Sequence, residues 1–221
     1  MKVILAKDLL GANNVKGENN REVFEQNGLL TLNIISSPGA GKTTLLEVTM
    51  RLLKNKYNFG VIEGDLYTSR DARRLMDHSR AIVQINTCGM CHLNADMVAR
   101  ALEDMPLASL DIIIIENVGN LVCPSAFYLG ETCKVAVLSV PEGSDKPAKY
   151  PELFKASRAV LINKADLLPY TDFDLPGCIR ELKEINPRAE IFVVSARTGE
   201  GMEKWLSWIE EGVLNVSGCT R

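Results

Sequence analysis

The chain lacks several features that would place it outside the class of single folded domains. No run of about 18 apolar residues occurs, and no apolar core of signal-peptide length follows the N-terminus, so we expect a cytoplasmic protein without a membrane partner. No linker rich in Pro, Gly or Ser divides the 221 residues, which favours one core domain. The 25 Lys and Arg residues are scattered among 28 Asp and Glu residues, and this net charge of −3 gives no indication of a nucleic-acid partner.

Short apolar, β-branched runs recur along the chain, most of them separated by helix-like stretches. Near-continuous runs such as Ile112–Ile115 are typical of strands buried on both faces of a parallel sheet. The alternation predicts an α/β fold with a doubly wound, mostly parallel sheet flanked by helices. Weak helical periodicity over 2–26, interrupted by Gly11 and Gly17, predicts an N-terminal helical arm. The expected strands cover 30–36, 59–63, 81–85, 111–116, 134–140, 159–163 and 190–194.

A phosphate-binding loop follows the first expected strand. Its small residues let backbone N–H groups point at phosphates, Lys42 supplies a positive charge for the β- and γ-phosphates, and the Thr43 hydroxyl can ligate Mg²⁺. The usual G-x-x-x-x-G-K-[ST] pattern has Ser36 at its first position here, and the alternative is a turn without function. The expected nucleotide contacts are Pro38, Gly39, Ala40, Gly41, Lys42, Thr43 and Thr44.

The tetrapeptide Asn163-Lys164-Ala165-Asp166 follows the sixth expected strand and is typical of guanine recognition. The Asp166 carboxylate can accept hydrogen bonds from N1–H and the exocyclic amino group of guanine, which adenine does not offer in that arrangement. Asn163 would bond near N7, and the Lys164 stem would cover the face of the base. Ser195 and Ala196 resemble the second base loop of GTPases. A helix N-cap would also explain Asp166, but the three motifs in this order predict a GTP/GDP site.

Three acids follow strands at the edge where the phosphate loop is expected, namely Asp65, Asp71 and Glu116. Together with Thr43 they are candidate Mg²⁺ ligands, and with Lys42 they are the candidate catalytic residues. Each acid could instead be a solvated carboxylate at a strand end. No glutamine is placed to orient the attacking water, so we expect slow intrinsic GTP hydrolysis unless a partner or second subunit completes the site.

Two segments that carry some of the six cysteines should lie close together in the fold. Cys91 and His92 follow the strand 81–85 and Cys123 follows the strand 111–116, and parallel strands end at one edge of the sheet. Thiolate and imidazole are ligands that Zn²⁺ and Ni²⁺ prefer, and a fourth position would stay open or be filled by a second chain across a twofold axis. The alternatives are buried structural cysteines, or a redox pair of Cys88 and Cys91.

These motifs together resemble the HypB family, the GTPases of the hydrogenase nickel-incorporation machinery in the SIMIBI class of P-loop NTPases. The resemblance covers about residues 2–213 and implies a GTP-dependent homodimer. It also implies nickel or zinc binding at Cys91, His92 and Cys123, and transfer of nickel to a [NiFe]-hydrogenase large-subunit precursor with a HypA-type accessory protein. The segments that carry it are Ser37–Thr44, Glu63–Asp65, Cys91–Ala95, Glu116–Pro124 and Asn163–Asp166.

We expect a helical arm over 1–28, a GTPase domain with an embedded metal site over 29–214, and a C-terminal tail over 215–221. Cys88 adds a thiol where similar proteins usually have Gly, so a fourth ligand from this chain is possible. Three alternatives stay open: a urease-type accessory GTPase, whose Cys-Pro-His motif is absent here; a cobalamin-type accessory GTPase, which would lack the Cys/His cluster; and a metal-binding module with a nucleotide switch and negligible turnover.

Overall fold

A single parallel sheet forms the centre of the protein, whose computed structural model describes residues 6–65 and 74–219. The sheet has seven strands in the order β3-β2-β4-β1-β5-β6-β7, and every neighbouring pair is parallel. All seven strands predicted from the sequence are confirmed. Their bounds are β1 Leu30–Ser36, β2 Phe59–Asp65, β3 Ala81–Asn86, β4 Ile112–Glu116, β5 Cys133–Ser139, β6 Ser157–Asn163 and β7 Glu190–Val193.

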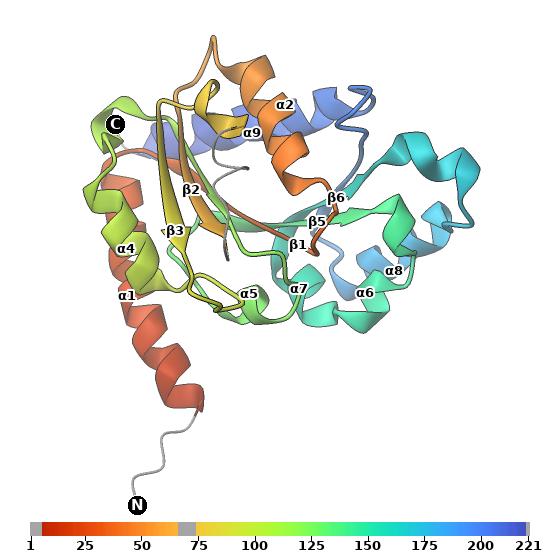
Figure 1. The fold of residues 1–221 in the computed structure, drawn as a ribbon, viewed down its shortest axis with the longest axis horizontal. Coiled ribbons are helices and arrows are strands. Elements are labelled where there is room, and N and C mark those ends of the chain that lie inside the picture. The colour runs from red at the N-terminus through yellow and green to blue at the C-terminus, as the bar shows by residue number, and fades with distance from the viewer. Residues whose placement is uncertain (1–5, 66–73, 220–221) are drawn as a thin grey trace, which may run out of the picture.

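Helices cover both faces of the sheet, as Figure 1 shows. Helices α2 and α9 pack on one face, while α1 and α4 cover one half of the other face and α7 and α8 cover its second half. This arrangement confirms the predicted doubly wound α/β fold. The helices are α1 Ala6–Gln26, α2 Lys42–Leu53, α4 Ala95–Glu103, α5 Cys123–Ala126, α6 Lys146–Lys149, α7 Pro151–Ala156, α8 Leu175–Ile185 and α9 Met202–Cys219.

The isoleucine run of β4 explains why the sheet is central. Successive side chains of a strand point to opposite faces, and here Ile112 and Ile114 pack with α2 and α9 while Ile113 and Ile115 pack with α1 and α4. All four are fully buried. Each face therefore has its own apolar core, and a strand with only one apolar face would not fit at this position.

Helix α1 runs without a break through Gly11 and Gly17, where the sequence pattern indicated interruptions. Gly17 is required by packing, because a Cβ there would lie 2.8 Å from Cδ1 of Tyr128 and 2.9 Å from its carbonyl oxygen. Farther along the helix, buried Asn20 donates hydrogen bonds from Nδ2 to the carbonyl oxygens of Ala95 and Leu129. The part of α1 from Gly17 onward is therefore fixed to the domain, while its first turns project beyond it (Figure 1). At the other terminus, α9 continues through residues that the sequence analysis assigned to a tail.

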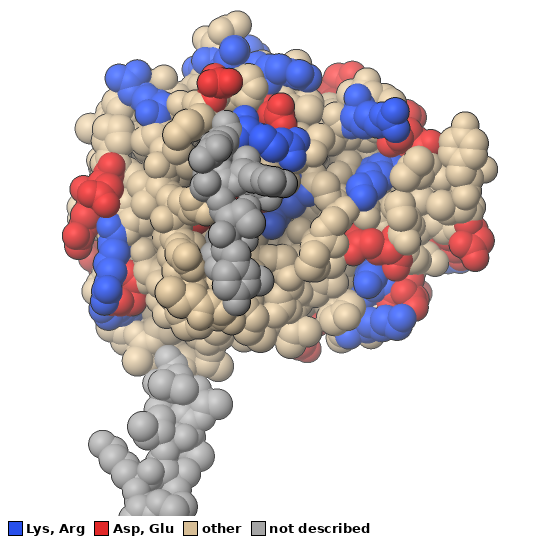
Figure 2. All heavy atoms as spheres, viewed as in Figure 1, with Lys and Arg blue, Asp and Glu red and all other residues tan. Residues whose placement is uncertain are grey.

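The carboxyl ends of β1, β2, β3, β4 and β6 meet at one edge of the sheet, and the segments that follow them carry most of the predicted functional residues. Two other cysteines lie away from this edge: Cys133 begins β5, and Cys178 is buried in α8. On the face drawn in Figure 2, the described acidic and basic side chains are interspersed rather than gathered by sign. Within the part of the chain that the structure describes, no helix is both long and apolar enough to cross a membrane.

Candidate functional site: a nucleotide pocket beside a thiol–imidazole cluster

The loop between β1 and α2 bends back on itself through two glycines in the left-handed region, Gly39 at φ 80° and Gly41 at φ 87°. A Cβ on Gly41 would lie 2.7 Å from Nδ2 of Asn163, so no larger residue fits there. The loop borders a cavity of about 580 Å³, and α2 begins directly at it. The helix thus directs its positive end at the cavity. The predicted contacts that line this cavity are Pro38, Gly39, Gly41, Lys42, Thr43, Thr44 and Lys164.

A buried carboxylate lies against the loop. Glu116 is 3% exposed, and its Oε1 accepts a hydrogen bond of 2.8 Å from the Thr43 hydroxyl and lies 3.4 Å from Nζ of Lys42. Its Oε2 is buried and has no hydrogen-bond partner among residues 6–65 and 74–219, which is a costly arrangement for a carboxylate oxygen. A hydroxyl and an unpartnered carboxylate oxygen side by side form a donor set suited to Mg²⁺, a hard cation with oxygen ligands. The residues present therefore fit this ion.

The other two candidate acids are described only in part. Asp65 is the last residue of β2 and pairs in register with Asn86, but its side chain lies outside the described part of the structure. Asp71 lies outside the described residues altogether. The structure adds Glu63, buried in β2, to the lining of the cavity.

The two base-recognition segments are joined by hydrogen bonds. The Ser195 hydroxyl donates to Oδ1 of Asp166 at 2.6 Å, which fixes the orientation of that carboxylate. The backbone N–H of Ala196 donates to Oδ1 of Asn163, and Nδ2 of Asn163 donates to the carbonyl oxygen of Ala40. Asn163 is 1% exposed, and through these two hydrogen bonds it connects the phosphate loop to the segment of Ser195 and Ala196. This is a structural role in addition to the predicted contact with guanine.

Lys164 connects the same two loops from the outside. Its backbone is left-handed at φ 61°, and its Nζ donates to the carbonyl oxygen of Gly39 at 2.6 Å. The aliphatic stem therefore spans from β6 to the phosphate loop, beside the cavity that it helps to line. This is the position from which a lysine stem can cover a bound base.

Sequence reasoning missed Arg74, which also lines the cavity. Its guanidinium donates to the Thr44 hydroxyl at 3.0 Å and to Oε2 of Glu47 at 2.6 Å, both on α2. A guanidinium at a phosphate pocket offers planar, bidentate hydrogen bonding to phosphate oxygens. Arg74 belongs to no recognisable motif, so only the tertiary structure could bring it to notice.

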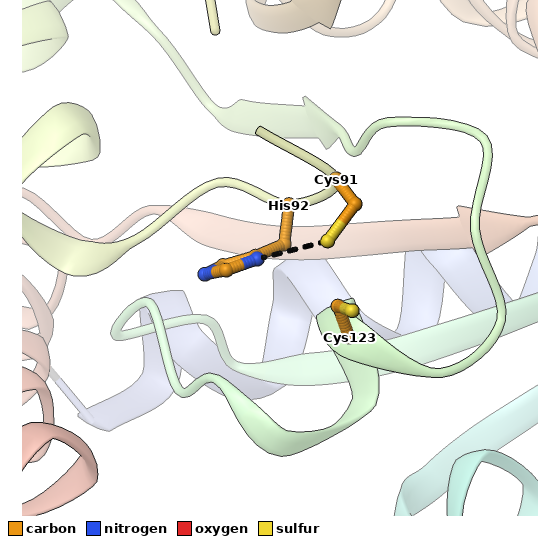
Figure 3. A group of neighbouring side chains, drawn as sticks. All are labelled: Cys91, His92 and Cys123. Atoms are coloured by element: carbon orange, nitrogen blue, oxygen red, sulfur yellow. Dashed lines mark hydrogen bonds between the residues drawn. The ribbon is translucent and has the colours of Figure 1, made fainter. Parts of the chain in front are cut away.

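The predicted metal ligands come together at the same edge of the sheet. One ligand atom from each of Cys91, His92 and Cys123 lies within 4.8 Å of the other two, and Nδ1 of His92 is 3.6 Å from Sγ of Cys91 (Figure 3). Two soft thiols and an imidazole fit Ni²⁺ or Zn²⁺ far better than a hard cation. Cys88 is exposed, hydrogen bonds with its Sγ to the Asn86 carbonyl oxygen, and is not a member of this group.

The local environment shifts the pKa values of the His92 imidazole and the Cys91 thiol in opposite directions. Burial lowers the pKa of His92, which favours the neutral imidazole that binds metals. A hydrogen bond with Cys123, and then burial, raise the pKa of the Cys91 thiol. The His92 ring also stacks on Phe127, with ring centroids 3.8 Å apart and planes 27° apart. Phe127, a contact that no sequence pattern indicated, fixes the plane of the ligand ring.

The nucleotide cavity and the thiol–imidazole cluster are connected by a short segment. Gly119 packs against the phosphate loop so closely that a Cβ would lie 3.1 Å from Cγ of Pro38 and 3.2 Å from its nitrogen. Only seven positions separate Glu116, which contacts the loop, from Cys123, which belongs to the cluster. The phosphate loop and the Cys123 thiol are therefore linked by one short, closely packed segment.

Comparisons with known proteins agree with this arrangement. Residues 30–193 match the family model described as CobW/HypB/UreG, nucleotide-binding domain. The hydrogenase maturation factor HypB of Escherichia coli is 51% identical over 203 residues, which cover 92% of this chain and 70% of that protein. The crystal structure of HypB from Helicobacter pylori in complex with nickel superposes with a TM-score of 0.88 at 38% identity, over 92% of this chain and 96% of that one.

The crystal structure of the hydrogenase maturation factor HypB from Archaeoglobus fulgidus gives a TM-score of 0.87 at 35% identity and covers 92% of this chain and all of that one. Sequence identity of this extent over most of both chains reaches well beyond a shared nucleotide-binding fold. The chain therefore belongs to the HypB family of hydrogenase maturation factors.

Proposed function

We propose that this chain hydrolyses GTP and carries nickel as cargo for the maturation of a [NiFe]-hydrogenase. The observation that carries the proposal is the placement of a thiol–imidazole cluster next to a guanine-nucleotide pocket. Cys91, His92 and Cys123 lie at the edge of the sheet that also holds Thr43 and Glu116. A single rearrangement at this edge can therefore affect both the nucleotide and the metal.

The nucleotide half of the proposal assigns each group a task. The loop N–H groups and Lys42 hold the β- and γ-phosphates, and Asp166, oriented by Ser195, selects guanine. Thr43 and Glu116 hold Mg²⁺, which neutralises charge on the phosphate oxygens when bound. Asp65 and Asp71 remain proposed members of this ion's surroundings and of the catalytic set. The described lining of the cavity contains no glutamine to orient water, which is consistent with slow hydrolysis.

The metal half of the proposal treats nickel as a substrate that must enter and leave. Cys91 is exposed and His92 and Cys123 are half-buried, so the cluster is open to a donor or an acceptor protein. Three ligands from one chain leave room for a further ligand from water, an accessory protein or a second subunit. Zinc suits the same donor set, so we expect it to compete with nickel.

Loss of the γ-phosphate is proposed to change the geometry at Cys123 through the segment that begins at Glu116. Such order changes in a loop after nucleotide hydrolysis are a common switching device. If GTP changes the affinity for nickel by some factor, nickel must change the affinity for GTP by the same factor. The proposal therefore predicts reciprocal coupling between the two ligands.

The proposed partners follow from the family. We propose a GTP-dependent homodimer, a HypA-type accessory protein that exchanges nickel, and a hydrogenase large-subunit precursor that receives it. The proposed location is the cytoplasm, where reducing conditions keep Cys91 and Cys123 as the free thiols that the structure shows.

The test is a titration of the purified protein with nickel chloride and with zinc chloride, in the presence of GDP or of a non-hydrolysable GTP analogue. Metal stoichiometry and oligomeric state are measured for the wild type and for Cys91→Ala. Single-turnover GTP hydrolysis, with Lys42→Ala as control, is measured in parallel. We expect nickel binding that needs Cys91 and hydrolysis that needs Lys42. Nickel binding that persists in Cys91→Ala would exclude the proposed site.

A further inference from the structure

Asn117, the residue directly after β4, lies between the nucleotide cavity and the interior of the domain. Its carbonyl oxygen accepts a hydrogen bond of 2.8 Å from Nζ of Lys42, the phosphate-binding lysine. Its backbone N–H donates to the carbonyl oxygen of Ile34 in β1 at 3.1 Å. The whole residue is buried, at 0% exposure. Its main chain thus contacts Lys42, a residue that lines the nucleotide cavity.

The side chain of Asn117 extends instead to the metal-binding arm, the segment Cys91–Ala95 that begins with two of the proposed metal ligands. Its Oδ1 accepts hydrogen bonds from the backbone N–H of Leu93 at 3.2 Å and of Val118 at 3.0 Å. Leu93 directly follows His92 and is fully buried, packed so tightly on β2 that a Cβ on Gly64 would lie 2.8 Å from its Cγ. One amide oxygen therefore fixes the point where the ligand-bearing arm enters the protein core.

Further hydrogen bonds hold the amide of Asn117 in this orientation. Its Nδ2 donates to Oδ1 of Asn33 at 3.2 Å, and Nδ2 of Asn33 donates to Oε1 of Glu131 at 3.1 Å. The second oxygen of Glu131 accepts from the backbone N–H of Leu129 at 2.6 Å. All the side chains of this chain of bonds are buried. A flipped amide would place donor against donor at Leu93, so the network fixes the acceptor toward the metal arm.

We propose that Asn117 is the positioning residue that transmits the state of the nucleotide pocket to His92, through the N–H of Leu93. This route leaves the covalent segment from Glu116 to Cys123 at Asn117, through the hydrogen bond to Leu93, and it reaches a different metal ligand. The inference rests on the proposed function, because it concerns how nickel binding at this cluster depends on the nucleotide.

The nucleotide can affect Asn117 because two acceptors compete for the ammonium group of Lys42. The phosphates of a nucleotide and the carbonyl oxygen of Asn117 both draw on Nζ of Lys42. GTP carries one more phosphoryl group than GDP, so the two nucleotides change how strongly Lys42 holds this carbonyl. A shift of the Asn117 backbone moves its amide oxygen, and the Leu93 N–H, buried away from water, must follow it or lose its acceptor.

The first experiment measures nickel affinity with nickel chloride, in saturating GDP and in a saturating non-hydrolysable GTP analogue, for the wild type and Asn117→Ala. The ratio of the nickel affinities in the two nucleotide states should be at least about five-fold closer to one in Asn117→Ala than in the wild type. Asn20→Ala is the matched control, because it also removes a buried asparagine that binds the same arm, at Ala95, without contacting Asn117. The control should keep the wild-type ratio within about two-fold.

An unchanged ratio in a folded Asn117→Ala protein would overturn the inference, and so would an equal loss of the ratio in Asn20→Ala. A wild-type ratio of one would overturn it together with the proposed coupling, while nickel binding that needs Cys91 and GTP hydrolysis that needs Lys42 would still support a nickel-carrying GTPase. Conversely, absence of nickel binding in the wild type would contradict the proposed function itself.

The second experiment needs neither metal nor a variant and remains decisive if Asn117→Ala does not fold. Hydrogen exchange at the Leu93 N–H is measured by NMR in the wild type with GDP and with the GTP analogue. We expect the exchange rates in the two states to differ by several-fold, since the strength of the bond to Asn117 differs. Identical rates in both states would contradict a nucleotide-dependent link at this position.

Discussion

The nucleotide pocket and the thiol–imidazole cluster differ in how firmly the protein fixes their side chains. In the pocket, Glu116, Asn163 and Ser195 are at most 3% exposed, and each hydrogen bonds to another segment of the site. In the cluster, Cys91 is exposed and His92 is fixed mainly by stacking on Phe127. The difference indicates a pocket shaped for one ligand beside a cluster that can release its cargo. Substitutions should therefore separate the two regions.

The largest expected effect is on the pocket. Lys42→Ala should slow single-turnover GTP hydrolysis by about 10²–10³-fold, because a preorganised charge on the transferred phosphoryl group is lost. The stoichiometry of nickel binding should remain that of the wild type, since Lys42 contacts none of the cluster. Hydrolysis is followed by phosphate release, and nickel is counted by equilibrium dialysis. A variant that loses both properties would show that the two regions cannot be separated.

The matching change in the cluster is Cys123→Ala. Removal of one of three ligands should weaken nickel binding by about 100-fold or more, since even residues that only support metal ligands contribute 10–100-fold. Affinity for GDP, measured with a fluorescent analogue, should stay within about three-fold. Cys133→Ala serves as the control, because this thiol begins β5 and lies outside the cluster. Equal losses in both cysteine variants would argue against a specific site.

The pH dependence of nickel binding should arise from the thiol–imidazole cluster alone. The pKa of the Cys91 thiol is raised, so a proton must leave it when nickel binds, and this one group contributes about tenfold per pH unit to the rise of nickel affinity below that pKa. Burial lowers the pKa of His92, so its imidazole competes for protons less than a solvent-exposed histidine does. Titrations between pH 6.5 and 8 should show a slope smaller by about one in Cys91→Ala. A slope unchanged by this substitution would remove Cys91 from the ligand set.

A smaller effect is expected from the aromatic support. Phe127→Ala should weaken nickel binding by about tenfold, because the His92 ring loses the surface that fixes its plane. Phe127→Tyr keeps the ring and should retain most of the affinity. Isothermal titration with nickel chloride measures both variants. If the alanine variant binds nickel as the wild type does, stacking has no part in ligand orientation.

The smallest effect concerns Cys88. Its thiol is exposed and lies outside the group formed by the three ligands, so Cys88→Ser should change nickel affinity by less than about two-fold. The same titration applies. A tenfold loss would mean that this turn moves when metal binds and that Cys88 becomes a fourth ligand.

Sequence patterns predicted the elements and the local motifs well. Seven apolar runs gave seven strands, because a strand buried on both faces, such as Ile112–Glu116, has few alternatives. The convergence of Cys91 and Cys123 followed from the rule that parallel strands end at one edge. The continuation of α1 through Gly17 was not predictable, because it depends on a close contact with Tyr128, distant in the sequence.

The residues that sequence reasoning missed all act through long-range contacts. Arg74 reaches Thr44, Phe127 reaches His92, and Asn117 reaches Leu93, each across 24 or more positions. The identity of these residues carries no signal of its own, since an asparagine after a strand is common in turns. Only the tertiary structure decides which distant residue each of these side chains contacts. Motifs therefore predicted what can bind, and the tertiary structure was needed to show how the binding groups are connected.

The central claim is that nickel binding at the cluster responds to the nucleotide in the pocket. Its most direct test is the nickel affinity of the wild type and of Cys91→Ala in GDP and in a non-hydrolysable GTP analogue. The account predicts binding that requires Cys91 and differs at least about five-fold between the two nucleotides. Equal affinities in the two states, or binding that does not need Cys91, would contradict it.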